Sequence, residues 1–550
     1  MSSSRKSLTT FLVLAFAAIL CILVATASQL RAQIYTDVHQ FNCAVEGCSP
    51  TYPEVLAEGR DGNLYGTTDS GGTSGMGTVF MVTTSGTLTT LHNFLGLDGQ
   101  NPDGGLVLGS DGNFYGTTRF GGASNLGTVF KITPAGVLTT LHSFSGTDGS
   151  EPRPGLVQGK SGAFYGTTCG FNPPWTAYSI TSTGVFKTIN ATNDVRIATC
   201  SSAPLILGND GNLYGTTMAG GVTETGTVFR MSPAGVLKTI FTGDFAHGTN
   251  LAAPVVQGSD GFLYGAAVAG GSGTFGVLFK LSTAGKYTIL HEFGLDLIHD
   301  GMYPYSGLVA ASDGRFYGAT SAGSGSGSVQ NGNLFSVTSS GSYNMLYAFD
   351  YLHGYLDQAT PMQHTNGKIY GVAEGGGPNF NSGVLYSLDN GELPFVRLMT
   401  RWGTAGQTVG ILGSGLTGTS AVKFGSGSAS FTVVSDSYVT AVVPSGGTAG
   451  FVTVTTPSGT FTSNQKFNVV PTITGIAPGS GSVGSQVTIT GKALLGASMV
   501  KFGGVKATSF TVNSGTSITA TVPTGALTGK VLVTTAGGTA SSKTVFTVTP

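Results

Sequence analysis

Three short motifs place an aspartate three residues before a histidine, and they are the strongest candidates for chemistry in this sequence. They are Asp244-Phe245-Ala246-His247, Asp296-Leu297-Ile298-His299 and Asp350-Tyr351-Leu352-His353. Carboxylate and imidazole groups bind divalent cations and polar ligands, and binding to imidazole weakens as the rings protonate below about pH 6.5. The alternative is a recurring loop cap that was copied by duplication. The sequence does not indicate which metal these motifs would bind.

Trp175 is a further candidate, because an indole ring can stack on a sugar, with packing inside its own loop as the alternative. No nucleophile elbow, phosphate-binding loop, zinc-protease motif or pair of catalytic carboxylates stands out in the sequence. The sequence therefore indicates neither a catalytic residue nor a cofactor. It favours ligand binding at the three Asp-x-x-His motifs over catalysis.

The candidate residues lie in a tandem repeat of seven units. A Tyr-Gly dipeptide recurs with its tyrosine at Tyr65, Tyr115, Tyr165, Tyr214, Tyr264, Tyr317 and Tyr370. A period of about 50 residues is typical of propeller arrays. Most units carry four strand signals, which in the second unit cover 106–109, 113–118, 127–133 and 138–144. The Asp-x-x-His motifs fall between the fourth strand of one unit and the first strand of the next. Neighbouring blades should therefore bring them, with Trp175, to one face of a ring.

The ends of the repeat array predict how the ring closes. Fourth strands share a Leu-His-x-Phe pattern, as in Leu91-His92-Asn93-Phe94, and the segment 35–41 ends in the similar Val38-His39-Gln40-Phe41. The seventh unit stops after its third strand, 384–388. We therefore expect the N-terminal segment to complete the last blade, which removes an exposed sheet edge. The histidines of the fourth strands, His39, His92, His142 and His291, are expected to be structural.

The repeat unit resembles the GloVer tandem repeat of bacterial choice-of-anchor proteins. The resemblance rests on Gly105-Leu106, the run Asp111-Gly112-Asn113-Phe114-Tyr115-Gly116-Thr117-Thr118, Gly121-Gly122, and Gly127-Thr128-Val129-Phe130-Lys131. It implies an exported surface protein and no known reaction.

The repetition changes after Pro394. The piece Val422-Lys423-Phe424-Gly425 recurs as Val500-Lys501-Phe502-Gly503, in two modules with alternating apolar residues. Both modules resemble immunoglobulin-like IPT/TIG domains. Their few basic residues favour a spacer or adhesion role over nucleic-acid binding.

Composition and the N-terminal segment indicate an exported chain. Charged residues are 9% of 550 and the net charge is −1, which gives no basic surface for nucleic acid. Arg5 and Lys6 precede an apolar run, 11–24, and small residues then offer cleavage after Ala27 or Ala32. This pattern predicts a secretory signal over 1–32. An uncleaved membrane anchor is the alternative.

Four cysteines remain after Cys21 is removed with the signal. An even number in an exported chain suggests disulfides, and we predict the pairs Cys43–Cys48 and Cys169–Cys200. Cys169 follows the second strand of the third unit and Cys200 precedes the next unit, so both fall at the same face. A metal site is the alternative, although no Cys-x-x-Cys pair occurs.

These observations predict an all-β chain, with a seven-bladed β-propeller over 34–392 and two immunoglobulin-like sandwiches over 394–469 and 471–550. We expect a monomer that is secreted to the extracellular space or cell surface, without a membrane contact after signal cleavage. Its loop face would bind a glycan or a protein, with the sandwiches as a spacer. The alternative is an extracellular hydrolase or lyase that acts on polysaccharide with the same loops.

Overall fold

All regular structure in the described part of the chain is β-strand. The computed structural model describes residues 33–48, 50, 56–170, 175–192, 203–296, 299–323, 331–355, 358–377 and 382–550. The predicted signal peptide, 1–32, lies outside these residues. Within them, no helix is long and apolar enough to span a membrane.

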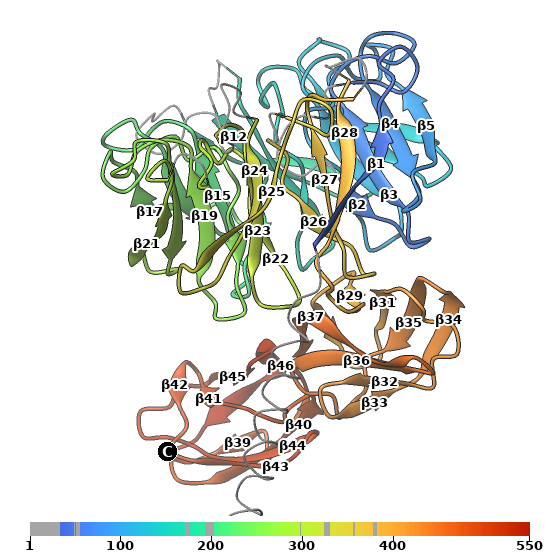
Figure 1. The fold of residues 1–550 in the computed structure, drawn as a ribbon. Coiled ribbons are helices and arrows are strands. Elements are labelled where there is room, and N and C mark those ends of the chain that lie inside the picture. Colours follow the sequence, from blue (N-terminus) through green and yellow to red (C-terminus); the bar gives the residue numbers. More distant parts are fainter. Residues whose placement is uncertain are drawn as a thin grey trace, which may run out of the picture.

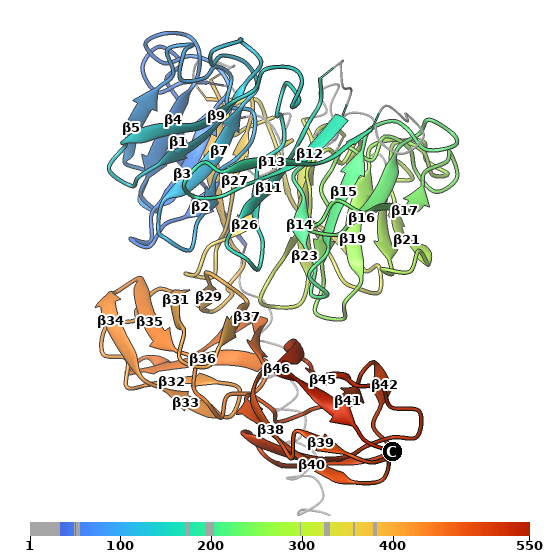
Figure 2. The same ribbon diagram turned by 180° about the vertical axis from the view of Figure 1, so that it is seen from behind.

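Seven four-stranded antiparallel sheets form the predicted propeller, with strands a to d of each blade running from the axis outwards (Figures 1 and 2). Blades one to three comprise β2 (Ala57–Glu58), β3 (Leu64–Thr68), β4 (Thr78–Val82), β5 (Leu88–Asn93); β6 (Val107–Leu108), β7 (Phe114–Thr118), β8 (Thr128–Ile132), β9 (Leu138–Ser143); and β10 (Val157–Gln158), β11 (Phe164–Thr168), β12 (Trp175–Ile180), β13 (Phe186–Thr192). Blades four to six comprise β14 (Ile206–Leu207), β15 (Leu213–Thr217), β16 (Thr227–Met231), β17 (Leu237–Thr242); β18 (Val256–Gln257), β19 (Leu263–Ala267), β20 (Val277–Leu281), β21 (Tyr287–Glu292); and β22 (Val309–Ala310), β23 (Phe316–Thr320), β24 (Asn333–Val337), β25 (Tyr343–Ala348). Blade seven comprises β26 (Met362–Gln363), β27 (Ile369–Ala373), β28 (Val384–Asp389) and β1 (Ile34–Gln40).

The repeated Tyr-Gly dipeptide joins each blade to its neighbours. In the second blade, Tyr115 donates a hydrogen bond to Asp111 Oδ2 of the a–b turn at 2.8 Å, and its ring stacks on Phe164 of the third blade with centroids 3.9 Å apart. A Cβ atom on Gly116 would lie 2.6 Å from the ring of Phe130 in strand c. Only glycine therefore lets strand b approach that aromatic residue, which explains why the two residues recur together.

The N-terminal strand closes the ring, as the sequence predicts. β1 pairs antiparallel with β28, from Ile34 opposite Asp389 onwards. The Tyr35 ring stacks on Tyr347 of the sixth blade at 3.8 Å, and Phe41 packs edge-on against Phe80 of the first blade at 5.2 Å. The segment after the propeller does not compete for this place, because β29 pairs with β31 instead.

Two sandwiches of the same topology follow. The first has sheets β29-β31-β35-β34 and β30-β37-β36-β32-β33, and the second has sheets β38-β40-β44-β43 and β39-β46-β45-β41-β42. The strands of the first are β29 (Arg397–Leu398), β30 (Trp402–Thr404), β31 (Thr408–Leu412), β32 (Ala421–Phe424), β33 (Gly427–Ala429), β34 (Phe431–Ser435), β35 (Tyr438–Val442), β36 (Gly450–Thr456) and β37 (Gly459–Val470). Those of the second are β38 (Thr472–Ala477), β39 (Ser480–Gly481), β40 (Gln486–Lys492), β41 (Met499–Phe502), β42 (Val505–Lys506), β43 (Phe510–Ser514), β44 (Ser517–Thr521), β45 (Gly529–Thr535) and β46 (Gly538–Val548). Strict alternation along β40 buries Val487 and Ile489 in the core.

The first sandwich docks on the end of the propeller that carries the a–b turns (Figures 1 and 2). Ser437 Oγ donates to the carbonyl oxygen of Arg60 in the first blade at 2.8 Å. Arg401 donates to Asn209 of the fourth blade at 3.1 Å, and Lys160 of the third blade lies 4.5 Å above the Trp402 ring. Because these contacts reach blades on different sides of the ring, the sandwich spans its centre.

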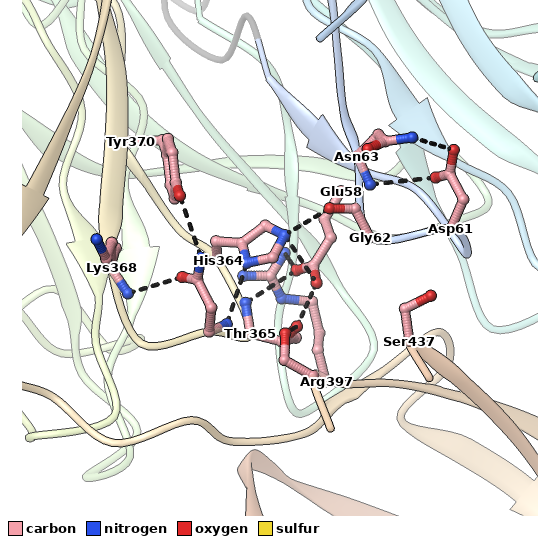
Figure 3. Close-up of polar contacts among 12 residues, drawn as sticks. Glu58, Asp61, Gly62, Asn63, His364, Thr365, Lys368, Tyr370, Arg397 and Ser437 are labelled. Atoms are coloured by element: carbon pink, nitrogen blue, oxygen red, sulfur yellow. Dashed lines mark hydrogen bonds and ion pairs between the residues drawn. The ribbon is translucent and has the colours of Figure 1, made fainter. Parts of the chain in front are cut away.

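A buried polar network joins this sandwich to the first and seventh blades (Figure 3). The Glu58 side chain is 1% exposed, and its carboxylate lies 3.3 Å from Arg397 Nη1 and accepts hydrogen bonds from the backbone N–H and hydroxyl of Thr365. His364 Nδ1 accepts the N–H of Asn366 at 3.0 Å, and its Nε2 lies 3.0 Å from the carbonyl oxygen of Gly62 and 3.4 Å from Glu58 Oε1. The Glu58 charge is thus compensated within the interface.

Candidate functional site on the loop face

The d–a and b–c connections lie at the end of the propeller away from the sandwiches, and we call this end the loop face (Figure 1). These two kinds of connection share one end because the strands of each blade are antiparallel, which places the a–b and c–d turns at the opposite end. All three Asp-x-x-His motifs lie on the loop face, as predicted.

Each histidine of these motifs binds the aspartate of its own loop. The Nδ1 atoms of His247, His299 and His353 lie 2.9, 2.9 and 2.8 Å from their aspartate oxygens. The hydrogen bond with Asp350 raises the pKa of His353. Among the residues that the structure describes, no group of three or more His, Cys, Asp or Glu side chains could hold a metal ion. The motifs therefore form three separate loop caps and not a shared cation site, while binding of another ligand by these residues stays a prediction.

The same pairing explains the histidines of strand d. His92, His142 and His291 lie 2.7, 2.8 and 2.9 Å from the aspartates of the following loops, Asp98, Asp148 and Asp300. In the fourth and sixth blades, Phe241 and Tyr347 replace this histidine, and the Asp-x-x-His loop supplies one of its own. The strand histidines and two of the loop motifs thus perform one structural task.

Trp175 does not reach the loop face. It is the first residue of β12, it is fully buried, and its ring packs edge-on against Phe229 of the fourth blade at 5.9 Å. The prediction that it could stack on a ligand is therefore wrong. An apolar indole between two blades is buried more favourably than it is exposed.

The described residues bear on both predicted disulfides. Cys169 is disulfide-bonded, and its predicted partner Cys200 lies outside the described residues. Cys43 and Cys48 are thiols, and the predicted bond between them is not formed. Burial raises the pKa of the Cys48 thiol to about 11, and hydrogen bonding to Cys43 adds to this shift. The thiol therefore stays protonated, whereas oxidation proceeds through the thiolate.

A charged cluster that the sequence did not reveal lies at the inner edge of the loop face. Asp69 and Arg119 directly follow strand b of the first two blades, and Asp103 and Arg153 lie just before strand a of the second and third. Glu151 Oε2 joins the two arginines, at 3.2 Å from Arg119 Nε and 3.2 Å from Arg153 Nη2. Other blades carry Cys169, Met218 and Val268 at the position of Asp69. Variation at one position of an otherwise repeated motif is the signal that could have located this cluster.

The carboxyl groups of Asp103 and Asp69 are hydrogen-bonded to each other. Asp103 is 3% exposed, and burial, followed by its hydrogen bond with Asp69, raises its pKa to about 9. The nearby Arg119 and Arg153 lower that pKa but do not reverse the shift. Burial and this hydrogen bond therefore favour the protonated, neutral form of Asp103.

Large apolar side chains stand exposed on the loop face. They are Leu95, Leu97, Met218, Val222, Phe245, Leu295, Tyr351 and Leu352, all in d–a or b–c connections. Leu97 and Phe245 are 84% and 80% exposed. Apolar side chains that are exposed in neighbouring connections can contribute to a surface that contacts a partner.

Comparisons with known proteins agree on the architecture. Residues 26–173 and 170–386 match the Gloeobacter/Verrucomicrobia repeat family, and residues 471–548 match the IPT/TIG domain family. No curated protein matches the chain.

Similar solved structures include proteins of several kinds. A fungal alcohol oxidase of the AA5 family, in complex with copper, is 12% identical, with a TM-score of 0.48 over 80% of this chain and 100% of that chain. A gluconolactonase from Xanthomonas campestris is 13% identical, with a TM-score of 0.35 over 67% of this chain and 93% of that chain. A surface glycan-binding protein from Prevotella bryantii is 19% identical, with a TM-score of 0.21 over 28% of this chain and 41% of that chain. Nothing about function follows from similarities of this size.

Proposed function

Since the chain belongs to the Gloeobacter/Verrucomicrobia repeat family, and its repeats build a complete propeller, we propose that it is an exported binding protein. The loop face holds an extracellular protein or glycan, and the two sandwiches act as a spacer. The observation that carries this proposal is the difference between the two ends of the propeller. One end carries the first sandwich, whereas the connections at the other end carry large exposed apolar side chains and a charged cluster.

The chemistry of the loop face favours a protein partner over a glycan. The exposed apolar residues are mostly aliphatic, as in Leu97 and Val222, and apolar side chains are typical of the core of a protein interface. Phe245 and Tyr351 are the exposed aromatic residues that could stack on a sugar. A glycan is therefore the second candidate.

The carboxyl pair favours binding over hydrolysis. Retaining glycosidases separate their two carboxyl groups by about 5 Å and inverting ones by more. Asp69 and Asp103 are in direct hydrogen-bond contact, and Asp103 is buried. A sugar ring cannot enter between them, so we assign this pair to the support of the loop face.

The proposal is tested by a loop-face variant, Leu97→Glu with Phe245→Glu, on arrays of extracellular proteins and of glycans. Binding should fall at least tenfold, because two exposed apolar contacts become charged. The matched control is Val137→Glu with Val236→Glu, at c–d turns where both valines are similarly exposed, and it should bind like the wild type. Equal binding by both variants, or no ligand on either array, would refute the proposal. Release of products from a polysaccharide would establish the hydrolase or lyase instead.

A further inference from the structure

A cavity runs along the propeller axis, beneath the loop face. The innermost strands of neighbouring blades contact one another there, as β2 does with β6 and β18 with β22. The first residue of strand a is apolar in every blade: Ala57, Val107, Val157, Ile206, Val256, Val309 and Met362. All seven side chains line one or both of two adjoining cavities, with volumes of 340 and 450 Å³.

The polar groups along this cavity are already bonded to the wall. Gln158 bonds the backbone N–H of Ser110 and the carbonyl oxygen of Gly162, both at 3.0 Å. Gln257 and Gln363 hold the turns of their own and the preceding blades in the same way. These three amides are therefore already satisfied by the wall, and the seven apolar side chains remain available to contact a ligand.

The first sandwich closes one end of the cavity. Leu398 and Met399 line both cavities from below, and Trp402 lines the larger one. Arg397 and Glu58 also line this end, where they are held in the buried network (Figure 3). The other end reaches Pro254 and Pro361, which precede the strands a of their blades on the side of the loop face.

We infer that the axial cavity is a binding site for a slender, uncharged molecule with an unbranched alkyl chain. An apolar cavity of about 150 Å³ holds one benzene molecule, so 340 Å³ has room for about a dozen non-hydrogen atoms. The seven apolar residues can pack against an alkyl chain, and the charged groups at the lower end, Glu58 and Arg397, are already paired with each other. The cavity extends along the axis from Pro254 and Pro361 to Leu398 and Met399, and this length suits a chain. This site is separate from the proposed partner surface, because it uses the innermost strands and not the loop tips.

The probe is decanol, titrated into the full chain by calorimetry and followed by thermal unfolding. We expect saturable binding to one site and a rise in Tm of several degrees, because a ligand that binds only the folded state stabilises it. In the variant Val107→Phe with Val256→Phe, the rings fill the cavity and binding should fall at least tenfold. The control Val137→Phe, at an exposed turn, should bind decanol like the wild type.

A crystal of the wild type soaked with decanol that carries a terminal bromine gives an answer that needs no variant. Anomalous density for bromine inside the ring of innermost strands is the expected result. Density only among the exposed leucines of the loop face, unchanged binding in the filled variant, or no saturable binding by the wild type would each overturn the inference. None of these outcomes bears on binding of a protein or glycan, which the loop-face variant tests separately.

Discussion

Asp103 shows how a single buried residue couples the loop face to pH. Burial and the hydrogen bond with Asp69 raise its pKa to about 9, while an aspartate in the unfolded chain titrates near 3.9. Between these values the folded protein keeps a proton that the unfolded chain releases. Stability from this group is therefore complete below about pH 4 and is lost as the pH rises towards 9.

The substitution Asp103→Asn should remove this pH dependence, because an amide stays neutral and can still donate to Asp69. We expect the Tm of the variant to exceed that of the wild type by a few degrees at pH 8, with a smaller difference at pH 5. Thermal unfolding monitored by circular dichroism across this range measures the effect. The control Glu224→Gln, at an exposed position, should leave the dependence of Tm on pH as it is in the wild type. Parallel curves for Asp103→Asn and the wild type would contradict the assignment.

At the residue scale, the sequence predicted the chemistry of side chains better than their surroundings. The Asp-x-x-His spacing predicted chemistry for these two residues. In the structure, each histidine is hydrogen-bonded to the aspartate of its own loop and not to a residue of a neighbouring loop. Trp175 was assigned to a loop because nothing in the local sequence shows the Phe229 ring that buries it. Asp69 and Asp103 belong to different repeats, so the sequence of one repeat does not show that they form a pair.

At the scale of the elements, β1 is a structural part of the seventh blade and not an N-terminal extension. Its place requires Phe41 at the junction with the first blade, where the residue is 3% exposed. Phe94 holds the equivalent place between the first and second blades, with its ring 5.4 Å from Phe130. The two phenylalanines should therefore contribute alike to stability.

Phe41→Ala and Phe94→Ala form a matched pair that tests this equivalence. Each should lower the free energy of unfolding by about 3–5 kcal/mol, the usual cost of removing a buried phenyl ring. Both should keep a single cooperative transition in denaturant. If Phe94→Ala is destabilised and Phe41→Ala unfolds like the wild type, the first strand frays independently and does not close the ring.

The blade strands were predictable because each repeat gives the same pattern seven times. The expected strands at 113–118 and 127–133 were found at Phe114–Thr118 and Thr128–Ile132. The innermost strand, expected at 106–109, is only Val107–Leu108, because Gly109 already belongs to the a–b turn. The turn residues therefore predict where a strand ends more accurately than the pattern of hydrophobic residues does.

For the molecule as a whole, the docking of the first sandwich on the propeller depends on one buried carboxylate. Glu58 accepts hydrogen bonds from Thr365 and faces Arg397 across the interface. The sequence predicted both sandwiches, but not this contact, because residues far apart in the chain meet there without a shared motif. Removing the arginine leaves a charge that water cannot reach.

Arg397→Met should therefore lower the free energy of unfolding by about 3–5 kcal/mol and free the sandwich from the propeller, as limited proteolysis between the two would show. The double variant Glu58→Gln with Arg397→Met should recover much of this loss, since no buried charge remains. The control Lys368→Met breaks an exposed ion pair with Asp389 and should cost less than about 1 kcal/mol. Equal losses in the single and double variants would show that packing, and not charge, holds the interface.

The pairing of β1 with β28 also fixes the order in which the propeller can assemble. Ile34 is synthesised long before Asp389, its partner across the seventh blade. Until that blade has emerged, β1 has no sheet to join, and the unfinished ring carries an open strand edge. Closure therefore has to wait until the seventh blade is available. At high concentration, two unfinished chains can exchange their first strands and become trapped as a swapped dimer.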